Sequence, residues 1–221
     1  MSAHSLILIG GIPRTGKTLS AQKLSALTGI NLLSSDMLRC AARNVIFDEP
    51  YVAVEKLQLT GTLQYHRPGV GLSETKEFYQ ILDESIFGWK AVCGAVDYYD
   101  RHGMSVIIEG EAITPDRAKE LQLKLLNLKL SAVFIGFTNK KFLDNIFKYS
   151  EQHADWVSLW RKEVDESVIR QWSEQQAVKS AQIKELCHQY GYMYHDVSEA
   201  TDSLHIMKVV NSLLRKVYNE T

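Results

Sequence analysis

A short run near the amino end, Gly11-Ile-Pro-Arg-Thr-Gly16-Lys17-Thr18, has the residue types and spacing of a phosphate-binding loop. Glycine adopts backbone conformations closed to residues with a Cβ, so consecutive N–H groups can point inward at an anion. The helix expected to open at Lys17 adds its free N–H groups and the positive end of its dipole. The run therefore predicts the binding of a polyphosphate.

Two side chains of this loop are expected to act on a bound nucleotide. Lys17 can reach the β- and γ-phosphates, and the Thr18 hydroxyl can ligate Mg²⁺. An apolar strand before the run and a helix after it are the context that a P-loop requires. We expect nucleotide contacts from Gly11, Ile12, Pro13, Arg14, Thr15, Gly16, Lys17, Thr18 and Leu19.

Two carboxylates in the middle of the chain are candidates for the other half of the nucleotide site. Glu109 follows the apolar run Val106-Ile-Ile, and a carboxylate at the end of such a strand can hold Mg²⁺ beside a triphosphate. Gly110 then permits a close approach of the chain. Glu111 points to the same end of the sheet and is a candidate for contact with substrate or with the waters of the metal. The other reading of Glu109 is a solvated carboxylate at a strand end.

Asp36 follows a second short apolar run, at the edge where open α/β sheets bind ligands. A carboxylate there can accept a proton from an attacking hydroxyl. Asp36 can also cap the helix predicted to begin at Met37, and the two roles are compatible. Arg39, one turn later, is a candidate for holding an anionic substrate or is a solvated helix residue.

The elements that must position these residues alternate short apolar runs with helical segments, which favours a parallel sheet with helices on both faces. The predicted strands are Ser5–Ile9, Asn31–Ser34, Ser105–Glu109, Leu130–Phe137 and Gly191–His195. The predicted helices are Lys17–Thr28, Met37–Val45, Lys76–Arg101, one starting at Thr114-Pro-Asp-Arg117, Asn139–Tyr149, Trp160–Tyr190 and about Ser203–Tyr218.

Three details of the helices are predicted from local signals. Leu19, Leu24 and Leu27 recur at helical spacing and predict the apolar face of the first helix, which Gly29 should end. The long helix before Arg101 has glycines at positions 88 and 94, where a break is left open.

The whole chain of 221 residues predicts a single domain over residues 1–221, with an irregular insertion at about 48–75 on the acceptor side. The net charge of −1 gives no general attraction to nucleic acid or acidic membranes. No apolar run approaches the roughly 18 residues of a membrane span. Three distant cysteines indicate reduced thiols. We therefore expect a cytoplasmic protein that binds neither membranes nor nucleic acid.

The motifs resemble those of small P-loop kinases of the nucleoside-monophosphate-kinase-like group. The resemblance rests on the P-loop run, on Leu-Ser-Ser-Asp36-Met-Leu-Arg39, and on Ile-Ile-Glu109-Gly-Glu-Ala-Ile-Thr-Pro115. Within the group the chain looks most like bacterial 2-phosphoglycerate kinase-like proteins and AAA-type predicted kinases. Shikimate and gluconate kinases, adenylate kinase and the zeta toxins are more distant look-alikes.

The resemblance implies a three-layer P-loop NTPase fold with a five-stranded parallel sheet and a helical lid at about residues 139–170. It implies ATP and Mg²⁺ as cofactors, and a role for Asp36 in handling the acceptor hydroxyl. In such kinases lid arginines clamp the transferred phosphoryl group, and Arg161 is the candidate here. The residues expected to bind the acceptor are Asp36, Arg39, Arg67 and Glu111.

The predicted function is an ATP- and Mg²⁺-dependent transfer of the γ-phosphate to a hydroxyl of a small molecule. Lys17, Asp36 and Arg161 would be the catalytic residues, with Thr18 and Glu109 on the metal. The alternative is a nucleotide-binding regulatory protein with little or no transfer, because the predicted lid is poor in arginine. A GTPase is excluded, since Asn139-Lys140 is followed by Phe142 where an aspartate must read guanine. A sugar, a hydroxy acid, a nucleoside or an antibiotic would all fit as acceptor.

Overall fold

A computed structural model describes residues 4–47, 84–139, 165–198 and 204–218. The predicted insertion at 48–75, with Arg67, lies outside the described residues. So do most of the predicted lid, including Arg161, and nearly all of the helix predicted over Asn139–Tyr149.

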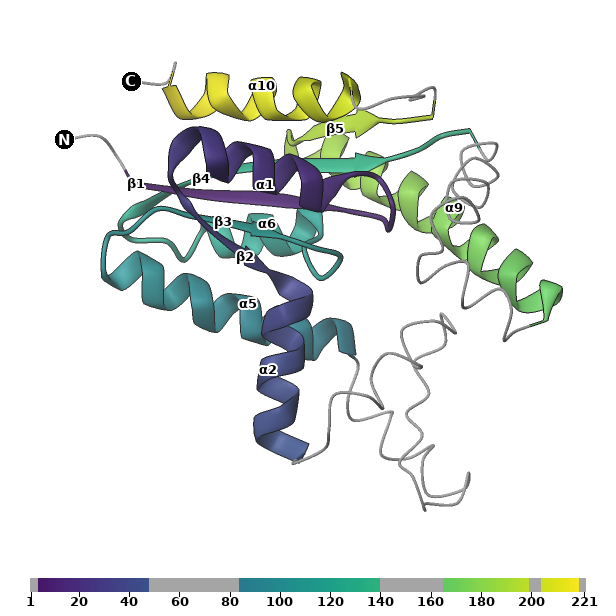
Figure 1. Cartoon of the computed structure of the whole chain (residues 1–221), viewed down its shortest axis with the longest axis horizontal. Helices are drawn as coiled ribbons and strands as arrows, with labels where there is room; N and C mark the ends of the chain where they lie inside the picture. Colours follow the sequence, from purple (N-terminus) through teal and green to yellow (C-terminus); the bar gives the residue numbers. More distant parts are fainter. Residues whose placement is uncertain (1–3, 48–83, 140–164, 199–203, 219–221) are drawn as a thin grey trace.

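The described residues form one sheet of five parallel strands in the order β2-β3-β1-β4-β5, with β1 at its centre (Figure 1). This confirms the predicted five-stranded parallel sheet. Leu6 to Ile9 in β1 are fully buried, because the strand has a neighbour on each side and helices over both faces. The strands are β1 (His4–Gly11), β2 (Asn31–Ser34), β3 (Val106–Glu109), β4 (Leu128–Gly136) and β5 (Met193–Asp196).

The helices complete a three-layer arrangement. On one face of the sheet lie α1 (Lys17–Thr28) and α10 (Leu204–Tyr218). The other face is covered by α5 (Glu84–Arg101), α6 (Pro115–Gln122) and α9 (Glu166–Tyr190), and α2 (Ser35–Phe47) packs against α5 (Figure 1). Within the described residues, no helix combines the length and the apolar character needed to cross a bilayer.

The first helix ends as predicted but buries a different face. Gly29 has a left-handed φ of 70°, and its N–H donates to the Ser25 carbonyl oxygen. Of the predicted apolar face, Leu24 is fully buried as expected, but Leu19 and Leu27 are 57% and 54% exposed, so the prediction is wrong for these two residues. The buried residues of α1 are Lys17, Ser20, Ala21 and Leu24. The buried side of α1 therefore runs through these four residues and leaves Leu19 and Leu27 on the exposed side.

Two predicted helix starts are corrected, and the break left open at Gly88 or Gly94 is absent from the described helix. The helix α2 begins at Ser35, not at Met37, so Asp36 lies in its first turn and is not its cap. The helix α5 runs without a break from Glu84 to Arg101. The helix α9 begins at Glu166, not at Trp160, because Asp165 has an extended backbone and serves as its N-cap residue.

The amino edge of the sheet is held by Asp100, which is 6% exposed. Its carboxylate accepts hydrogen bonds from the backbone N–H groups of Leu126, Asn127 and Leu128, at 2.9, 2.9 and 2.8 Å. Burial acts to raise the pKa of Asp100, but these three bonds outweigh it and the pKa is lowered. Asp100 therefore ties the end of α5 to the start of β4.

Candidate functional site

The turn between β1 and α1 has a backbone that only glycine accepts at its first position. Gly11 has a φ of 127°, and a Cβ there would lie 2.0 Å from the carbonyl oxygen of Ile135 in β4. Gly16 has a φ of 82° and lies beside the His205 ring of α10. Arg14 also has a left-handed φ, 64°, which is strained for a residue with a side chain. The loop is thus a preformed bend at the carboxyl edge of the sheet.

Lys17 is folded back over this loop and is 7% exposed. Its ammonium donates to the Ile12 carbonyl oxygen, which also accepts a 2.9 Å hydrogen bond from the Thr15 hydroxyl. Burial lowers the pKa of Lys17, although the carboxylates of Glu111, Glu109 and Asp36 act in the opposite direction. A buried cation with a lowered pKa is stabilised when an anion such as phosphate comes beside it.

The pair expected to hold a metal is in contact. The Thr18 hydroxyl donates to the Glu109 carboxylate at 3.2 Å, across a separation of 91 residues. Glu109 is 4% exposed, and burial raises its pKa; Lys17 and hydrogen bonds from Ser34 and Thr18 only partly oppose this. Oxygen ligands of this kind suit Mg²⁺, and a buried carboxylate with a raised pKa gains from a cation beside it. The residues present therefore fit the implied metal.

The turn after β3 comes close to the start of α2. Gly110 has a φ of 143°, and a Cβ there would lie 1.8 Å from the Ser35 hydroxyl oxygen. The predicted close approach at Gly110 is thus present. Because Ser34 and Glu109 are paired in the parallel register, this contact brings Asp36 to the same edge as the loop.

Asp36 and Arg39 form an ion pair on the first turns of α2. Their closest nitrogen and oxygen atoms are 3.7 Å apart, with 53% of the Asp36 side chain and 17% of the Arg39 side chain exposed. Although the side chain is half-exposed, partial desolvation by neighbouring protein raises the pKa of Asp36, and the guanidinium of Arg39 opposes this shift. A carboxylate with a raised pKa is a better proton acceptor than an ordinary one.

Glu111 lies just beyond β3 and pairs with a residue of α9. Its carboxylate is 3.4 Å from the ammonium of Lys179, with both side chains partly exposed. The pKa of Lys17 responds to Glu111 and Lys179 as well as to Glu109 and Asp36. The structure therefore brings together the P-loop, the two strand-end acids, Asp36 and a lysine from a distant helix.

Sequence reasoning missed three residues of this region: Ser34, Lys179 and His205. Ser34 was assigned only to a strand, yet its side chain hydrogen-bonds to Glu109. Lys179 and His205 sit on helices whose packing angle brings them to the edge of the sheet, and no local pattern marks either residue. Only the paired register of β2 and β3 could have pointed to Ser34.

Comparison with solved structures agrees with this architecture. A gluconokinase from Sinorhizobium meliloti 1021 superposes with a TM-score of 0.53 at 12% identity, covering 100% of this chain and 98% of that one. A shikimate kinase from Bacteroides thetaiotaomicron gives 0.51 at 14% identity, over 96% and 98% of the two chains. A dephospho-CoA kinase from Campylobacter jejuni gives 0.51 at 9% identity, over 98% of each.

The chain has the fold of the P-loop small-molecule kinases. No protein-family model and no curated protein sequence matches it. Because the sequence identities are only 9–14%, the similarity to these kinases shows the fold alone. The roles of the site residues rest on the structure of this chain. In this P-loop kinase fold, Lys17, Thr18, Asp36 and Glu109 meet at the carboxyl edge of the sheet.

Proposed function

We propose that the protein transfers the γ-phosphoryl group of ATP to a hydroxyl of a small molecule, with Mg²⁺ as cofactor. The observation that carries the proposal is the contact between Thr18 and Glu109 beside the P-loop, with Asp36 in the first turn of α2, directly after the neighbouring strand β2. A phosphate cradle alone would suit any nucleotide-binding protein. A proton-accepting carboxylate beside it favours transfer to a hydroxyl.

In the proposed reaction, the acceptor oxygen attacks the γ-phosphorus and the bond to the β–γ bridging oxygen breaks. ADP leaves, and the acceptor proton passes to the Asp36 carboxylate. Backbone N–H groups of the loop from Arg14 to Thr18 would hold the phosphates, and the Lys17 ammonium would neutralise charge on the transferred group. Thr18 and Glu109 would hold Mg²⁺, which supplies further neutralisation of phosphate charge. Positioning and charge neutralisation are the main requirements of phosphoryl transfer.

Two further residues belong to the proposal, Arg161 through the family resemblance and Arg67 through its place in the irregular insertion. Arg161 would close over the phosphates, and Arg67 would contact the acceptor. Both lie outside the described residues, so their roles stay predictions. Arg39 and Glu111 would contact the acceptor from the described part of the site.

The test is a screen of hydroxylated metabolites for stimulation of ADP release from Mg²⁺-ATP. Stimulation by one compound class, with formation of its phosphate ester, is the expected result. Tight nucleotide binding without stimulation by any hydroxyl compound would contradict transfer and favour the regulatory alternative. Absence of nucleotide binding would contradict both.

A further inference from the structure

The interior of α5 contains a glycine, Gly88, that the backbone of the helix does not require. Gly88 is buried, and it lacks the left-handed φ that Gly11, Gly16 and Gly110 have. Glycine inside a helix lowers the stability of that helix relative to alanine, because the unfolded chain has more freedom to lose. The reason for a glycine at this position therefore lies in the space around it.

The space beside Gly88 is filled by the side chain of Arg39. A Cβ at Gly88 would lie 3.5 Å from the Arg39 Cδ, 3.8 Å from the Arg39 Cβ and 3.5 Å from the Ala112 Cβ. A methyl group would make ordinary contacts at these distances, but a longer side chain on that side would overlap the arginine stem or Ala112. Three elements meet here: α5, the helix α2 packed against it (Figure 1), and the turn after β3.

Ala112 is held in place from its other side. Arg117 of α6 donates a 3.0 Å hydrogen bond to the Ala112 carbonyl oxygen. The guanidinium carbon of Arg117 also lies 5.8 Å from the ring centre of Trp89, the residue next to Gly88. Because the turn is tied to α6 in this way, a longer side chain at position 88 would displace the flexible stem of Arg39 and not Ala112.

The contact with Gly88 fixes an ion pair that helix geometry alone would leave loose. Arg39 and Asp36 are three residues apart on α2, and exposed pairs at this spacing contribute little to stability. Here only 17% of the Arg39 side chain is exposed, against 53% of the Asp36 side chain. The arginine stem packs on α5, so its guanidinium stays 3.7 Å from the carboxylate, while the carboxylate remains open to an acceptor.

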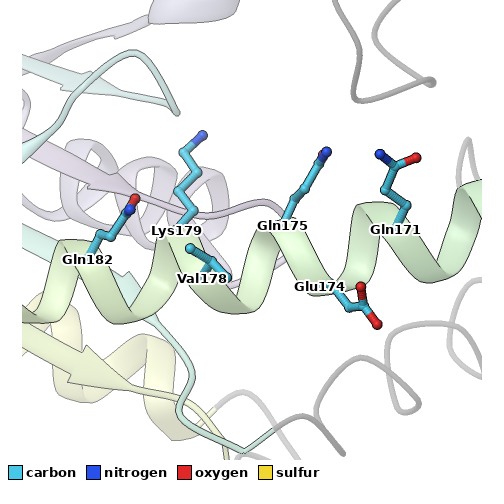
Figure 2. A pocket seen from close by; sticks show the side chains of 6 residues that line it. All are labelled: Gln171, Glu174, Gln175, Val178, Lys179 and Gln182. Carbon is cyan, nitrogen blue, oxygen red and sulfur yellow. The ribbon is translucent and has the colours of Figure 1, made fainter.

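The hollow along α9 is a separate feature from this contact. Its volume is about 580 Å³, and within the described part of the chain only residues of α9 line it. Figure 2 shows these side chains projecting from that one helix. The packing of Arg39 beside Asp36 involves α5 and the turn after β3 instead. The lining residues are Gln171, Glu174, Gln175, Val178, Lys179 and Gln182.

We propose that Gly88 is a positioning residue for phosphoryl transfer, because the absence of a side chain there lets Arg39 pack across α5 and hold its guanidinium beside the Asp36 carboxylate. The inference rests on the proposed phosphotransferase function. Arg39 keeps Asp36 in one place while the acceptor oxygen approaches, and a displaced Arg39 removes that constraint. A misplacement of about 1 Å at a reacting group can lower a rate roughly a hundredfold. A contact remote from the phosphates therefore controls turnover.

The first experiment asks whether Gly88 positions Arg39. Gly88→Ala, Gly88→Leu and Gly94→Leu are compared with the wild type by NMR of the arginine Nε–Hε groups, and Arg39→Lys assigns the Arg39 signal. Gly94 is the matched control, because it is an exposed position of the same helix where an added Cβ would meet nothing within 4 Å. We expect the Arg39 signal to shift in Gly88→Leu alone. An unchanged signal in this variant overturns the inference, and Gly88→Val replaces it if Gly88→Leu does not fold.

The second experiment asks whether the position of Arg39 controls transfer. The probe is the hydrolysis of Mg²⁺-ATP with water as the acceptor, and nucleotide affinity is measured separately by calorimetry. Gly88→Leu and Arg39→Met should each lower kcat about tenfold or more, because Asp36 loses its fixed place. The nucleotide Kd should change less than about twofold, since the P-loop is untouched. Gly94→Leu and the conservative variant Gly88→Ala should retain the wild-type kcat.

The double variant of Gly88→Leu with Arg39→Met shows whether the two positions act together. If Gly88 acts through Arg39, the kcat of the double variant should stay within about twofold of that of Arg39→Met alone. Multiplied effects in the double variant, or a full kcat in either single variant, would overturn the positioning role and leave the proposed function intact. A wild type that does not bind Mg²⁺-ATP, or that releases no ADP with water or any screened hydroxyl compound, would instead contradict the proposed function. The NMR comparison then decides by itself whether Gly88 positions Arg39.

Discussion

Two carboxylates, Asp100 and Glu109, are almost fully buried at opposite edges of the sheet, with exposed fractions of 6% and 4%. Asp100 at the amino edge receives three backbone N–H donors, and its pKa is lowered. Glu109 at the carboxyl edge has mainly side-chain partners, Ser34, Thr18 and Lys17, and its pKa is raised by burial. The same chemical group is thus stabilised as an anion at one edge and destabilised at the other.

The opposite pKa shifts of Asp100 and Glu109 distinguish a structural carboxylate from one that can bind a ligand. A carboxylate whose hydrogen bonds are all supplied by the backbone contributes to stability and leaves no place for a ligand. A buried carboxylate whose charge is not fully compensated is stabilised by an incoming cation. Lys17 shows the converse case, because it is a buried ammonium with a lowered pKa that a phosphate would stabilise. Each of the following substitutions alters one edge of the sheet and should leave the structure and properties of the other edge unchanged.

The largest effect is expected from Lys17→Met at the carboxyl edge. ATP turnover should fall about a thousandfold, since one preorganised donor to a developing charge is worth roughly 10²–10³ in rate. The fold should remain, because the variant removes a buried charge and leaves the apolar stem. Turnover and the thermal unfolding midpoint are measured on the same preparation. Unchanged turnover in a folded variant would refute the mechanism.

Asp36→Asn should have the next largest effect, confined to transfer. Acceptor phosphorylation should fall about a hundredfold, at the low end of the roughly 10²–10⁴ contributed by general bases. Nucleotide affinity should change little, because the P-loop is untouched. Isothermal titration with a non-hydrolysable ATP analogue and a phosphorylation assay separate the two. Equal loss of binding and transfer would assign Asp36 a metal-binding or structural role instead.

Asp100→Asn tests the amino edge and should destabilise the fold by about 2–3 kcal/mol, since hydrogen bonds to a charged group are the stronger ones. The folded-state pKa of Asp100 is lowered below 3.8, so its contribution is present above that pH. It is lost as pH falls through the folded-state pKa. Urea unfolding should show a large difference from the wild type at pH 7 and a smaller one near pH 3. A loss of nucleotide affinity in the folded variant would contradict the separation of the edges.

Glu109→Gln should give the smallest effects. It should raise the stability of the metal-free protein and weaken its use of Mg²⁺. The folded-state pKa of Glu109 is raised above 4.5, so the wild type loses stability as pH rises through that window. The variant should therefore melt slightly higher than the wild type at pH 8 without metal, and equally at pH 4. The Mg²⁺ concentration needed for activity should rise about tenfold or more. A lower melting temperature at pH 8 would mean that Glu109 is a structural acid.

The parts predictable from sequence are those governed by neighbours along the chain. The bend between β1 and α1, the Gly29 stop and the strands β1 and β3 follow from glycine positions and short apolar runs, and the structure confirms each. Of the predicted apolar face of α1, Leu24 is buried but Leu19 and Leu27 are exposed, because the side that packs in the molecule runs through Lys17, Ser20 and Ala21.

The remaining features depend on contacts between distant segments. Asp100 falls near the end of the predicted helix Lys76–Arg101, yet its hydrogen-bond partners lie 26 to 28 residues later. The pairing of Glu111 with Lys179 spans 68 residues and depends on how α9 crosses the sheet. No periodicity in a single sequence encodes such a distance, so these residues required the structure.

The proposed function depends on the bend from Gly11 to Thr18 holding a polyphosphate with its backbone N–H groups. A crystal structure with Mg²⁺ and a non-hydrolysable ATP analogue tests it most directly. We expect the phosphates inside this bend, with the metal beside Thr18 and Glu109. A nucleotide bound elsewhere, with the bend empty or extended, would contradict it.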